Sequence, residues 1–211
     1  MKTTMLAQRS VDNVGAVQTG RKLLLLLTVA MVATLFVFGA SRLPYPLRET
    51  FAWVGLGLII VCIIGRTWCA LYIGGRKTTR LVTTGPYSVC RNPLYLFSII
   101  GAVGVGAQFG AFSVAIIPGL CAWIVHVRAV LQEERLLLAT HGDAYRDYLA
   151  RVPRFVPRVR LWHNVEVLEV RPREVVTTFF DACFFLAAVP IAAAFEHFQA
   201  VGYVPVVLWL P

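Results

Sequence analysis

The chain has 211 residues, of which 58% are hydrophobic and only 15% are charged, and its mean hydropathy is +0.70. A water-soluble domain of this size usually has about a quarter of its residues charged. The long apolar segments therefore predict an all-α integral membrane protein and exclude a soluble globular domain. The net charge of +9 does not indicate nucleic-acid binding, because the basic residues lie between apolar segments, where anionic lipid headgroups attract them.

The cysteines and histidines are scattered along the chain and predict neither a disulfide nor a metal site. No pair of cysteines has CxxC spacing, and their number is odd. Most of the cysteines lie in apolar segments and are interpreted as small hydrophobic residues. The residues concerned are Cys62, Cys69, Cys90, Cys121, Cys183, His126, His141, His163 and His197.

The first part of the chain predicts a leader and two membrane-spanning helices. Residues 1–20 are polar, and the apolar run 23–40 follows Arg21 and Lys22. A cleaved signal peptide is the alternative, but cleavage after residue 40 would require a small residue where Phe38 stands. We therefore expect a retained first span, a proline-containing turn over 41–50 and a second helix over 51–73.

Arg66 lies in the second predicted helix, ~10 Å from its end at a rise of ~1.5 Å per residue. Two interpretations are open. The long side chain can extend to the cytoplasmic membrane surface, or it can face an internal pocket and bind a substrate there.

The middle of the chain predicts a helical hairpin. After a polar loop over 74–91, apolar segments over 94–108 and 111–127 give the third and fourth spans, and Gly101, Gly104 and Gly106 are expected to let these two helices approach closely. The fourth helix is expected to continue beyond the membrane to residue 139 and to stop at Gly142.

The rest of the chain predicts one more span. Residues 145–149 are expected to form a single helical turn, and 161–174 a polar connection with strand character. Residues 175–195 give the fifth span, and the apolar tail 201–210 is short enough to lie in the membrane interface. The predicted organisation is a leader (1–20), anchoring helices (21–83), a core (84–158) and a C-terminal extension (159–211).

The distribution of charge predicts the orientation. Of the 20 Lys and Arg residues, only Arg42 and Arg48 fall in the turn after the first span, and the other 18 lie in segments that five spans place on the opposite side. That side is expected to be cytoplasmic. The prediction is therefore a membrane protein with its N-terminus and its polar clusters in the cytoplasm.

Two polar clusters flank the predicted hairpin. In the first, Pro93 forces Asn92 out of helical conformation, so Asn92 is expected to cap a helix whose free N–H groups attract an anion. In the second, Tyr145 and Tyr148 share a helical face, whereas Glu133 and Glu134 point about 100° apart, so at most one is expected to face a shared pocket. Taken singly, the first cluster equally fits a plain loop-to-helix junction, and the second fits membrane-interface anchoring or a solvated helix end.

Four motifs stand in register over residues 84–158: Thr84-Gly-Pro-Tyr-Ser-Val-Cys-Arg-Asn-Pro-Leu-Tyr95, Glu133-Glu134-x-x-Leu137, Gly142-x-x-Tyr145-x-x-Tyr148 and Val152-Pro-Arg-Phe-Val-Pro157. Together they resemble the isoprenylcysteine carboxyl methyltransferase family, which is related to the phospholipid N-methyltransferases. The resemblance covers roughly residues 50–158 and is to a bacterial-type member.

The resemblance implies a membrane-embedded methyltransferase that uses S-adenosyl-L-methionine in a cytoplasmic pocket formed by the loop before the third span and the segment after the fourth. The implied acceptor is a lipid-like or prenylated molecule, methylated on a carboxylate or an amine. The implied cofactor-binding residues are Tyr87, Val89, Asn92, Pro93, Leu94, Tyr95, Glu133, Glu134, Tyr145 and Tyr148. The residues assigned to catalysis are Arg91, Glu134 and Arg154, and those assigned to the acceptor are Arg66, Arg154 and Phe155.

Asn92 replaces the histidine of the eukaryotic members, and because asparagine does not titrate, no imidazole base acts at this position. We assign Glu134 to the amino or ribose groups of the cofactor and the helix start to its carboxylate. Arg154 or Arg91 is assigned to an anionic acceptor. Two alternatives remain: a related membrane reductase that uses NADPH on a sterol-like substrate, and a catalytically silent membrane scaffold or lipid-binding protein.

Overall fold

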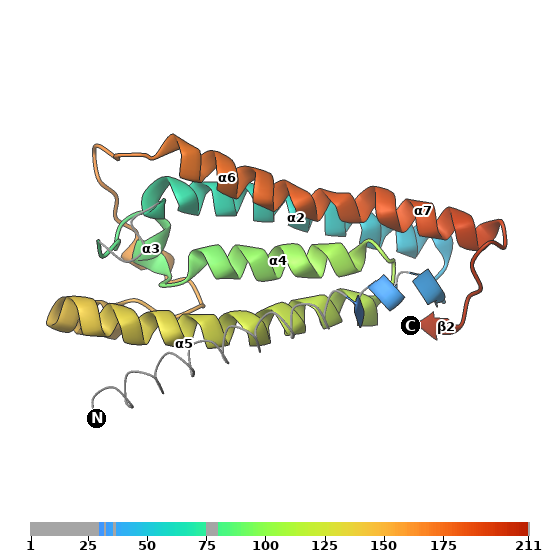
Figure 1. Cartoon of the computed structure of the whole chain (residues 1–211), viewed down its shortest axis with the longest axis horizontal. Helices are drawn as coiled ribbons and strands as arrows, with labels where there is room; N and C mark the ends of the chain where they lie inside the picture. The colour runs from blue at the N-terminus through green and yellow to red at the C-terminus, as the bar shows by residue number, and fades with distance from the viewer. Residues whose placement is uncertain (1–29, 32, 36, 75–79, 211) are drawn as a thin grey trace, which may run out of the picture.

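The computed structural model describes residues 30–210 except positions 32, 36 and 75–79. The described part is an elongated bundle of helices that run along one long axis (Figure 1). The elements are β1 (Gly39–Ser41), α2 (Tyr45–Ile73), α3 (Pro86–Val89), α4 (Pro93–Ala107), α5 (Phe112–Arg151), η1 (Val159–Leu161), α6 (Pro172–Cys183), η2 (Phe184–Ala187), α7 (Ala188–Ala200) and β2 (Leu208–Leu210).

Three described helical segments are long and apolar enough to cross a membrane, and they confirm the prediction of an all-α integral membrane protein. They are Tyr45–Ile73, Phe112–Arg151 and the continuous run Pro172–Ala200, and α4 is a shorter apolar helix of 15 residues. The predicted leader and half of the predicted first span lie outside the described residues, so the total of five spans stays a prediction.

The second predicted helix begins earlier than expected, at Tyr45 rather than at residue 51. The prolines at 44 and 46 led to the prediction of a turn, but Pro44 occupies the N-cap position and Pro46 lies in the first turn. Proline is tolerated in a first turn because the N–H group that it lacks has no partner there.

The glycines of α4 pack differently from the prediction. Gly101 and Gly104 lie against α2, where a Cβ atom would come within 2.5 Å of Cys62 Sγ and within 2.7 Å of the carbonyl oxygen of Gly55. Only Gly106 lies against α5. α4 is therefore in close contact with α2 as well as with its hairpin partner, and it lies between them (Figure 1).

Gly142 interrupts α5, as predicted. Its φ and ψ of 52° and −122° are not helical, and the chain beyond it forms a second helical segment that continues to Arg151. This segment is longer than the single turn expected over 145–149. Positive φ is readily adopted only by glycine, which is why the direction of the helix changes at this position.

The C-terminal extension packs back onto the bundle. Its helical run begins at Pro172 and ends at Ala200, so it extends beyond both predicted bounds, and α6 packs along α2. Residues 161–174 contain no strand, contrary to the prediction. The tail instead ends in β2, which pairs in parallel with β1 through Gly39↔Leu208, Ala40↔Trp209 and Ser41↔Leu210.

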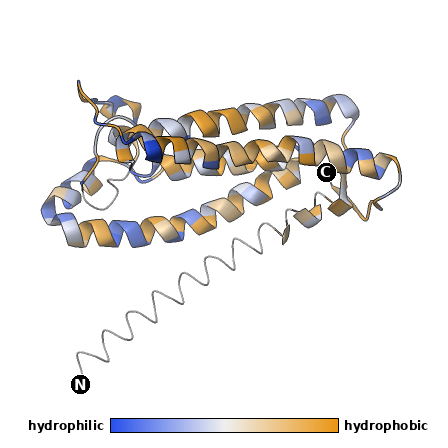
Figure 2. Ribbon diagram, turned by 45° about the horizontal axis from the view of Figure 1, so that its top comes forward, coloured by the Kyte–Doolittle hydropathy of each residue, from blue (hydrophilic) through white to orange (hydrophobic). Residues whose placement is uncertain are grey.

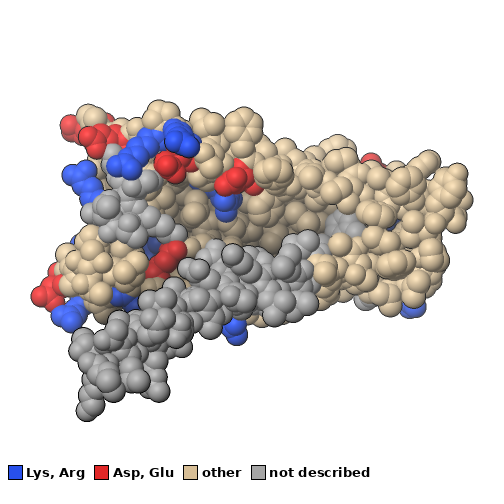
Figure 3. Space-filling view, viewed as in Figure 1, with Lys and Arg blue, Asp and Glu red and all other residues tan. Residues whose placement is uncertain are grey.

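Polarity is distributed unevenly along the bundle. Apolar residues cover most of the helix length in Figure 2, and Lys, Arg, Asp and Glu side chains gather in Figure 3 at the end of the molecule that carries α3. This concentration of charge fits the predicted assignment of that end to the cytoplasmic side.

Candidate active site

The loop before α4 is shaped by a glycine turn. Gly85 has φ of 59°, and a Cβ atom at this position would come within 2.3 Å of the ring of Tyr72. Pro86 then begins the short helix α3. Ser88 Oγ donates to the carbonyl oxygen of Gly85 at 2.6 Å and accepts from the backbone N–H of His163 at 3.2 Å. The turn is thus closed on one side by its own serine and on the other by the C-terminal extension.

Asn92 and Pro93 lie at the start of α4, as predicted, but Asn92 does not cap the helix. Its side chain makes no hydrogen bond to the helix N–H groups, and Nδ2 instead donates to the carbonyl oxygen of Arg154 at 3.2 Å. The capping prediction is therefore wrong. Because no side chain caps them, the first N–H groups of α4 keep their capacity to bind an anion.

The tail segment, which we define as residues 152–158, lies directly against this loop. The backbone N–H of Arg91 donates to the carbonyl oxygen of Pro153, and that of Arg158 donates to Val89, each at 2.9 Å. Cys90 Sγ donates to the carbonyl oxygens of Arg154 and Phe155 at 3.5 and 3.4 Å. The two segments that the motifs pair are therefore adjacent in space.

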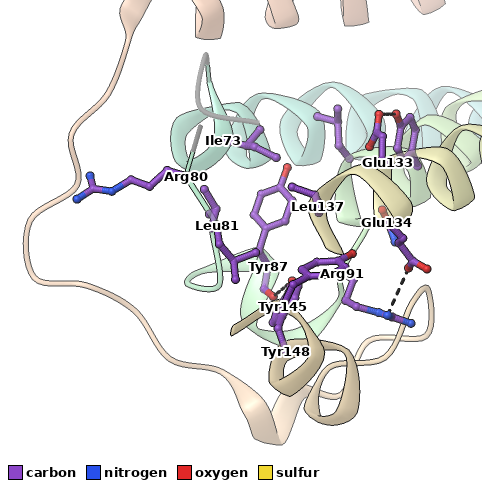
Figure 4. A pocket seen from close by; sticks show the side chains of 14 residues that line it. Ile73, Arg80, Leu81, Tyr87, Arg91, Glu133, Glu134, Leu137, Tyr145 and Tyr148 are labelled. Atoms are coloured by element: carbon purple, nitrogen blue, oxygen red, sulfur yellow. Dashed lines mark hydrogen bonds and ion pairs between the residues drawn. The ribbon is translucent and has the colours of Figure 1, made fainter. Parts of the chain in front are cut away.

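Both glutamates of α5 line the same pocket, whereas the helical spacing predicted at most one. Tyr95 donates from its hydroxyl to Glu133 Oε1 at 2.5 Å. Glu134 faces two arginines: Arg91 Nη1 lies 3.3 Å from Oε1, and Arg154 reaches both carboxylate oxygens. Figure 4 shows Glu134 directed toward Arg91 and Glu133 directed elsewhere along α5. The pocket is wide enough along α5 for adjacent residues to border it on two sides.

Tyrosines fill the space between the two walls. Tyr148 donates from its hydroxyl to the backbone carbonyl of Tyr87 at 2.7 Å, and its ring packs against that of Tyr145. Tyr87 is 4% exposed, and burial, with smaller contributions from neighbouring acidic groups, raises its pKa well above the usual value. The Tyr87 hydroxyl is therefore protonated at neutral pH and is available to a ligand as a hydrogen-bond donor, not as a base.

The structure brings most of the predicted cofactor residues into one pocket. The predicted residues that line it are Tyr87, Arg91, Asn92, Leu94, Tyr95, Glu133, Glu134, Tyr145 and Tyr148. The lining residues that the sequence reasoning missed are Ile73, Arg80, Leu81, Val82 and Leu137. Leu137 belongs to the motif Glu133-Glu134-x-x-Leu137 but is assigned no role, and the other four carry no motif. The one signal of these four in the sequence is their closeness to the two clusters.

The remaining predicted residues lie outside this pocket. Val89 contributes its backbone carbonyl to the tail segment, and Pro93 forms the helix start. Arg154 reaches Glu134 from a side chain that is 42% exposed, and Phe155 packs against Trp123 with ring centroids 4.5 Å apart. Arg66 borders a second cavity, within the apolar part of the bundle.

The pocket has the polar groups that an adenosine-bearing methyl donor needs, but its free volume is small. Within the described residues, Tyr87 Oη and Arg91 Nε are buried without a hydrogen-bond partner. Such atoms are suited to a ligand, because a buried polar group without a partner destabilises the folded protein. The free volume is about 50 Å³, whereas small-molecule sites usually hold about 300–1,000 Å³. A bound donor therefore requires side chains to move apart.

Comparison with known proteins identifies the family. A model of the family described as phospholipid methyltransferase matches residues 51–144. A nickel-cobalt-cadmium resistance protein, NccN, from Alcaligenes xylosoxydans xylosoxydans is 37% identical over 75% of this chain and 74% of its own length. The cobalt-zinc-cadmium resistance protein CzcN from Cupriavidus metallidurans is 34% identical over 86% of this chain and 84% of its own length. The chain belongs to the phospholipid methyltransferase family.

A relative that is named for its activity supports the same assignment. The protein-S-isoprenylcysteine O-methyltransferase of Schizosaccharomyces pombe is 32% identical over 39% of this chain and 35% of its own length. No solved structure matches the chain significantly. The protein is thus a membrane methyltransferase, and the comparisons favour this prediction over the reductase and scaffold alternatives.

The names of the two bacterial relatives refer to metals, but the described residues contain no group of three or more His, Cys, Asp or Glu side chains that could hold a metal ion. The expectation that the enzyme takes no metal stays a prediction.

Proposed function

We propose that the protein transfers a methyl group from S-adenosylmethionine to a lipid-like or prenylated acceptor held in the membrane. The observation that carries this proposal is the position of Tyr95, which lines the polar pocket and contacts His126, a residue of the large apolar cavity. A water-soluble donor and a membrane-soluble acceptor require two such chambers that meet at one point.

The residues of the pocket suit the donor. Glu133 and Glu134 are acceptors for the amino group and ribose hydroxyls of an adenosine. The uncapped N–H groups at the start of α4 suit its carboxylate. Tyrosine rings attract a cation through their faces, and four tyrosines line the pocket, namely Tyr87, Tyr95, Tyr145 and Tyr148. The site therefore combines carboxylate acceptors, backbone N–H donors and aromatic rings, each of which suits one part of a charged nucleoside.

Donor binding is expected to rearrange the ion pairs of Glu134. Its side chain and that of Arg91 are each 11% exposed, so this pair lies inside the closed pocket. Arg154, in the tail segment, is more exposed and contacts Glu134 from the solvent side of the pocket. Release of Glu134 by Arg154 would free one carboxylate for the donor and open the pocket toward the cytoplasmic side.

Methyl transfer requires little from the protein beyond the positioning of donor and acceptor. When bound, the donor supplies an already activated methyl group on a sulfonium. The two walls orient the reactants in line and exclude water. The tyrosine hydroxyl of residue 87 stays protonated because burial raises its pKa, and residue 92 is an asparagine, so neither serves as a general base at neutral pH.

The acceptor is proposed to enter from the membrane. The name of the yeast relative refers to isoprenylcysteine, a prenylated carboxylate, and the family model refers to phospholipids. Both classes have a long apolar chain, which the apolar cavity suits. Arg154 and Phe155 remain candidates for contacts with the acceptor headgroup, on the side that we propose to be cytoplasmic in a bacterial inner membrane.

Methyl transfer from labelled donor into a total membrane lipid extract tests the proposal. Detergent-purified protein is expected to label an organic-extractable product, and Glu134→Ala is expected to label far less. Glu196→Ala, which removes a carboxylate at the other end of the bundle, is the matched control and is expected to keep its activity. Labelling that is equally low in the wild-type protein and in a sample without protein would contradict the proposal.

A further inference from the structure

A second cavity, of about 560 Å³, lies inside the bundle between α2, α4, α5, η2 and α7. Its wall is almost entirely apolar and includes Val105, Pro118, Val125, Phe185 and Ile191. Its volume is in the range of cavities that bind small molecules, about 300–1,000 Å³. The polar residues that border it are Arg66, Ser98 and His126.

Arg66 stands out among these three because its charge is unpaired. Its Nη1 donates to Ser98 Oγ, and its Nε is buried without a hydrogen-bond partner. Within the part of the chain that the structure describes, no carboxylate pairs with it. A guanidinium does not lose its proton in proteins, so the charge persists inside the apolar part of the bundle. A charge in such a place normally has a partner or a function.

The position of Arg66 relative to the polar pocket is the second observation. Ser98, which Arg66 contacts, lies three residues after Tyr95 on α4, so the two side chains share a face about one helical turn apart. Tyr95 in turn lies against His126, with ring centroids 4.8 Å apart, and hydrogen bonds to Glu133. Ser98 lies about 4.5 Å further along α4 than Tyr95, at ~1.5 Å per residue. The Arg66 side chain, which reaches Ser98 from α2, is therefore on the apolar side of the point where the two chambers meet.

We propose that Arg66 binds an oxyanion of the acceptor and so selects an anionic amphiphile, with the apolar chain of that molecule in the cavity. This inference rests on the proposed function. A carboxylate and a phosphate diester both satisfy it, because a guanidinium binds the paired oxygens of either group. A neutral or cationic amphiphile of the same chain length would leave Arg66 unpaired inside the bundle, and its binding is disfavoured for that reason.

The arrangement also distinguishes the two sources of the oxyanion. Methylation of a carboxylate removes the charge, so the ester product loses its attraction to Arg66. Methylation of an amine elsewhere on a phospholipid leaves the phosphate charge, and the product keeps that attraction. Arg66 itself is unchanged in either reaction, and its role is to position and select the acceptor.

The test measures binding rather than turnover. Dissociation constants are measured in a nonionic detergent by microscale thermophoresis with four probes: oleate, dioleoylphosphatidylglycerol, oleyl alcohol and oleylamine. The wild-type protein is expected to bind at least one of the two anionic probes about tenfold more tightly than the alcohol or the amine. A preference for oleate identifies a carboxylate, and a preference for the phospholipid identifies a phosphate diester. Equal affinity for all four probes would overturn the proposal.

Substitutions of Arg66 test whether this residue causes the preference for anionic probes. Arg66→Gln is expected to abolish the preference, and Arg66→Lys to keep part of it. The control Arg128→Gln removes an exposed arginine of α5 that borders neither cavity and is expected to behave as the wild-type protein does. An undiminished preference in Arg66→Gln would overturn the assignment. If Arg66→Gln does not fold, the Arg66→Lys variant and the four wild-type affinities decide.

Binding of S-adenosylmethionine is measured on the same samples and separates the two proposals. Absence of anion selectivity in the wild-type protein, with donor binding intact, counts against the role of Arg66 alone. Anion selectivity without donor binding counts against the proposed function alone.

Discussion

Arg154 binds both carboxylate oxygens of Glu134: Nε donates to Oε1 at 3.0 Å and Nη2 to Oε2 at 2.8 Å. This bidentate pair joins the tail segment to α5, and the same carboxylate also faces Arg91 at 3.3 Å. Because Arg91 belongs to the loop before α4, one glutamate connects all three segments around the pocket. Glu134 is therefore the residue whose change is expected to affect the site most.

Glu134→Gln is expected to weaken binding of S-adenosylmethionine by about tenfold or more, because the charged acceptor for the donor is lost. The unfolding temperature is also expected to fall, because Arg91, whose side chain is 11% exposed, loses its charged partner. The pair with Arg154 contributes less to this fall, since Arg154 is 42% exposed. Calorimetric titration of the donor measures the first effect. Glu196→Gln, which alters the pair with Arg48 at the other end of the bundle, is the control. Equal donor affinity in the two variants would remove Glu134 from the site.

The hydroxyl of Tyr148 is expected to stabilise the fold, because it donates to the backbone carbonyl of Tyr87 at 2.7 Å in a buried place. Tyr148→Phe leaves that carbonyl without this donor and is expected to lower the free energy of unfolding by about 1–3 kcal/mol. Tyr145→Phe, in the neighbouring ring, removes no hydrogen bond to that carbonyl and is the matched control. Thermal unfolding in detergent compares the two, and equal stability would show that the bond contributes nothing.

Gly142 and Gly57 provide a comparison of backbone conformation. A Cβ atom would meet nothing within 4 Å at either position, but Gly142 has φ of 52° whereas Gly57 lies within α2. Gly142→Ala is expected to destabilise the protein by about 1–3 kcal/mol through backbone strain. Gly57→Ala is expected to stabilise it by about 0.5–1 kcal/mol. Unfolding temperatures that shift in the same direction would show that the break at Gly142 is not a fixed feature of the fold.

Some features of the fold and of the candidate site could be predicted from the sequence, and others could not. The pairing of the loop with the tail segment followed from four motifs in register. The partner of Asn92 did not, because an asparagine before a proline has the same local pattern whether its side chain caps the helix or donates to Arg154. The distinction depends on a partner that lies 62 positions away in the sequence. Local periodicity likewise placed α4 in the membrane but did not show that Gly101 and Gly104 face α2.

The C-terminal extension shows the same limit. Residues 161–174 alternate in a way that is typical of a strand, yet the backbone N–H of Gly85 donates to His163 at 2.9 Å and Tyr72 donates to Asn164 at 3.0 Å. These contacts fix the segment against the loop of the site. Hydrogen bonds between distant segments leave no period in the sequence, so propensity alone predicts the wrong local structure here.

The buried thiol of Cys90 is expected to make the stability of the protein depend on pH. Burial is the main cause that raises the pKa of its thiol, against smaller opposing contributions from a backbone hydrogen bond and Arg91. A raised pKa in the folded state means that the neutral thiol is favoured there. Its contribution to stability is therefore complete below the unfolded pKa of about 8.5 and decreases as pH rises through the folded value.

The check is to compare the wild-type protein with Cys90→Ala between neutral pH and about pH 10. The gap in unfolding temperature between the two is expected to shrink, or to reverse, on the alkaline side. A gap that stays constant over this range would contradict a raised pKa for Cys90.

The central claim is that the loop before α4 and residues 133–148 together hold S-adenosylmethionine. Titration of S-adenosylmethionine, S-adenosylhomocysteine and NADPH into detergent-purified protein tests it most directly. We expect saturable binding of the first two at one site, weakened in Tyr95→Ala, and no binding of NADPH. Binding of NADPH alone, or binding of none of the three by folded protein, would contradict it.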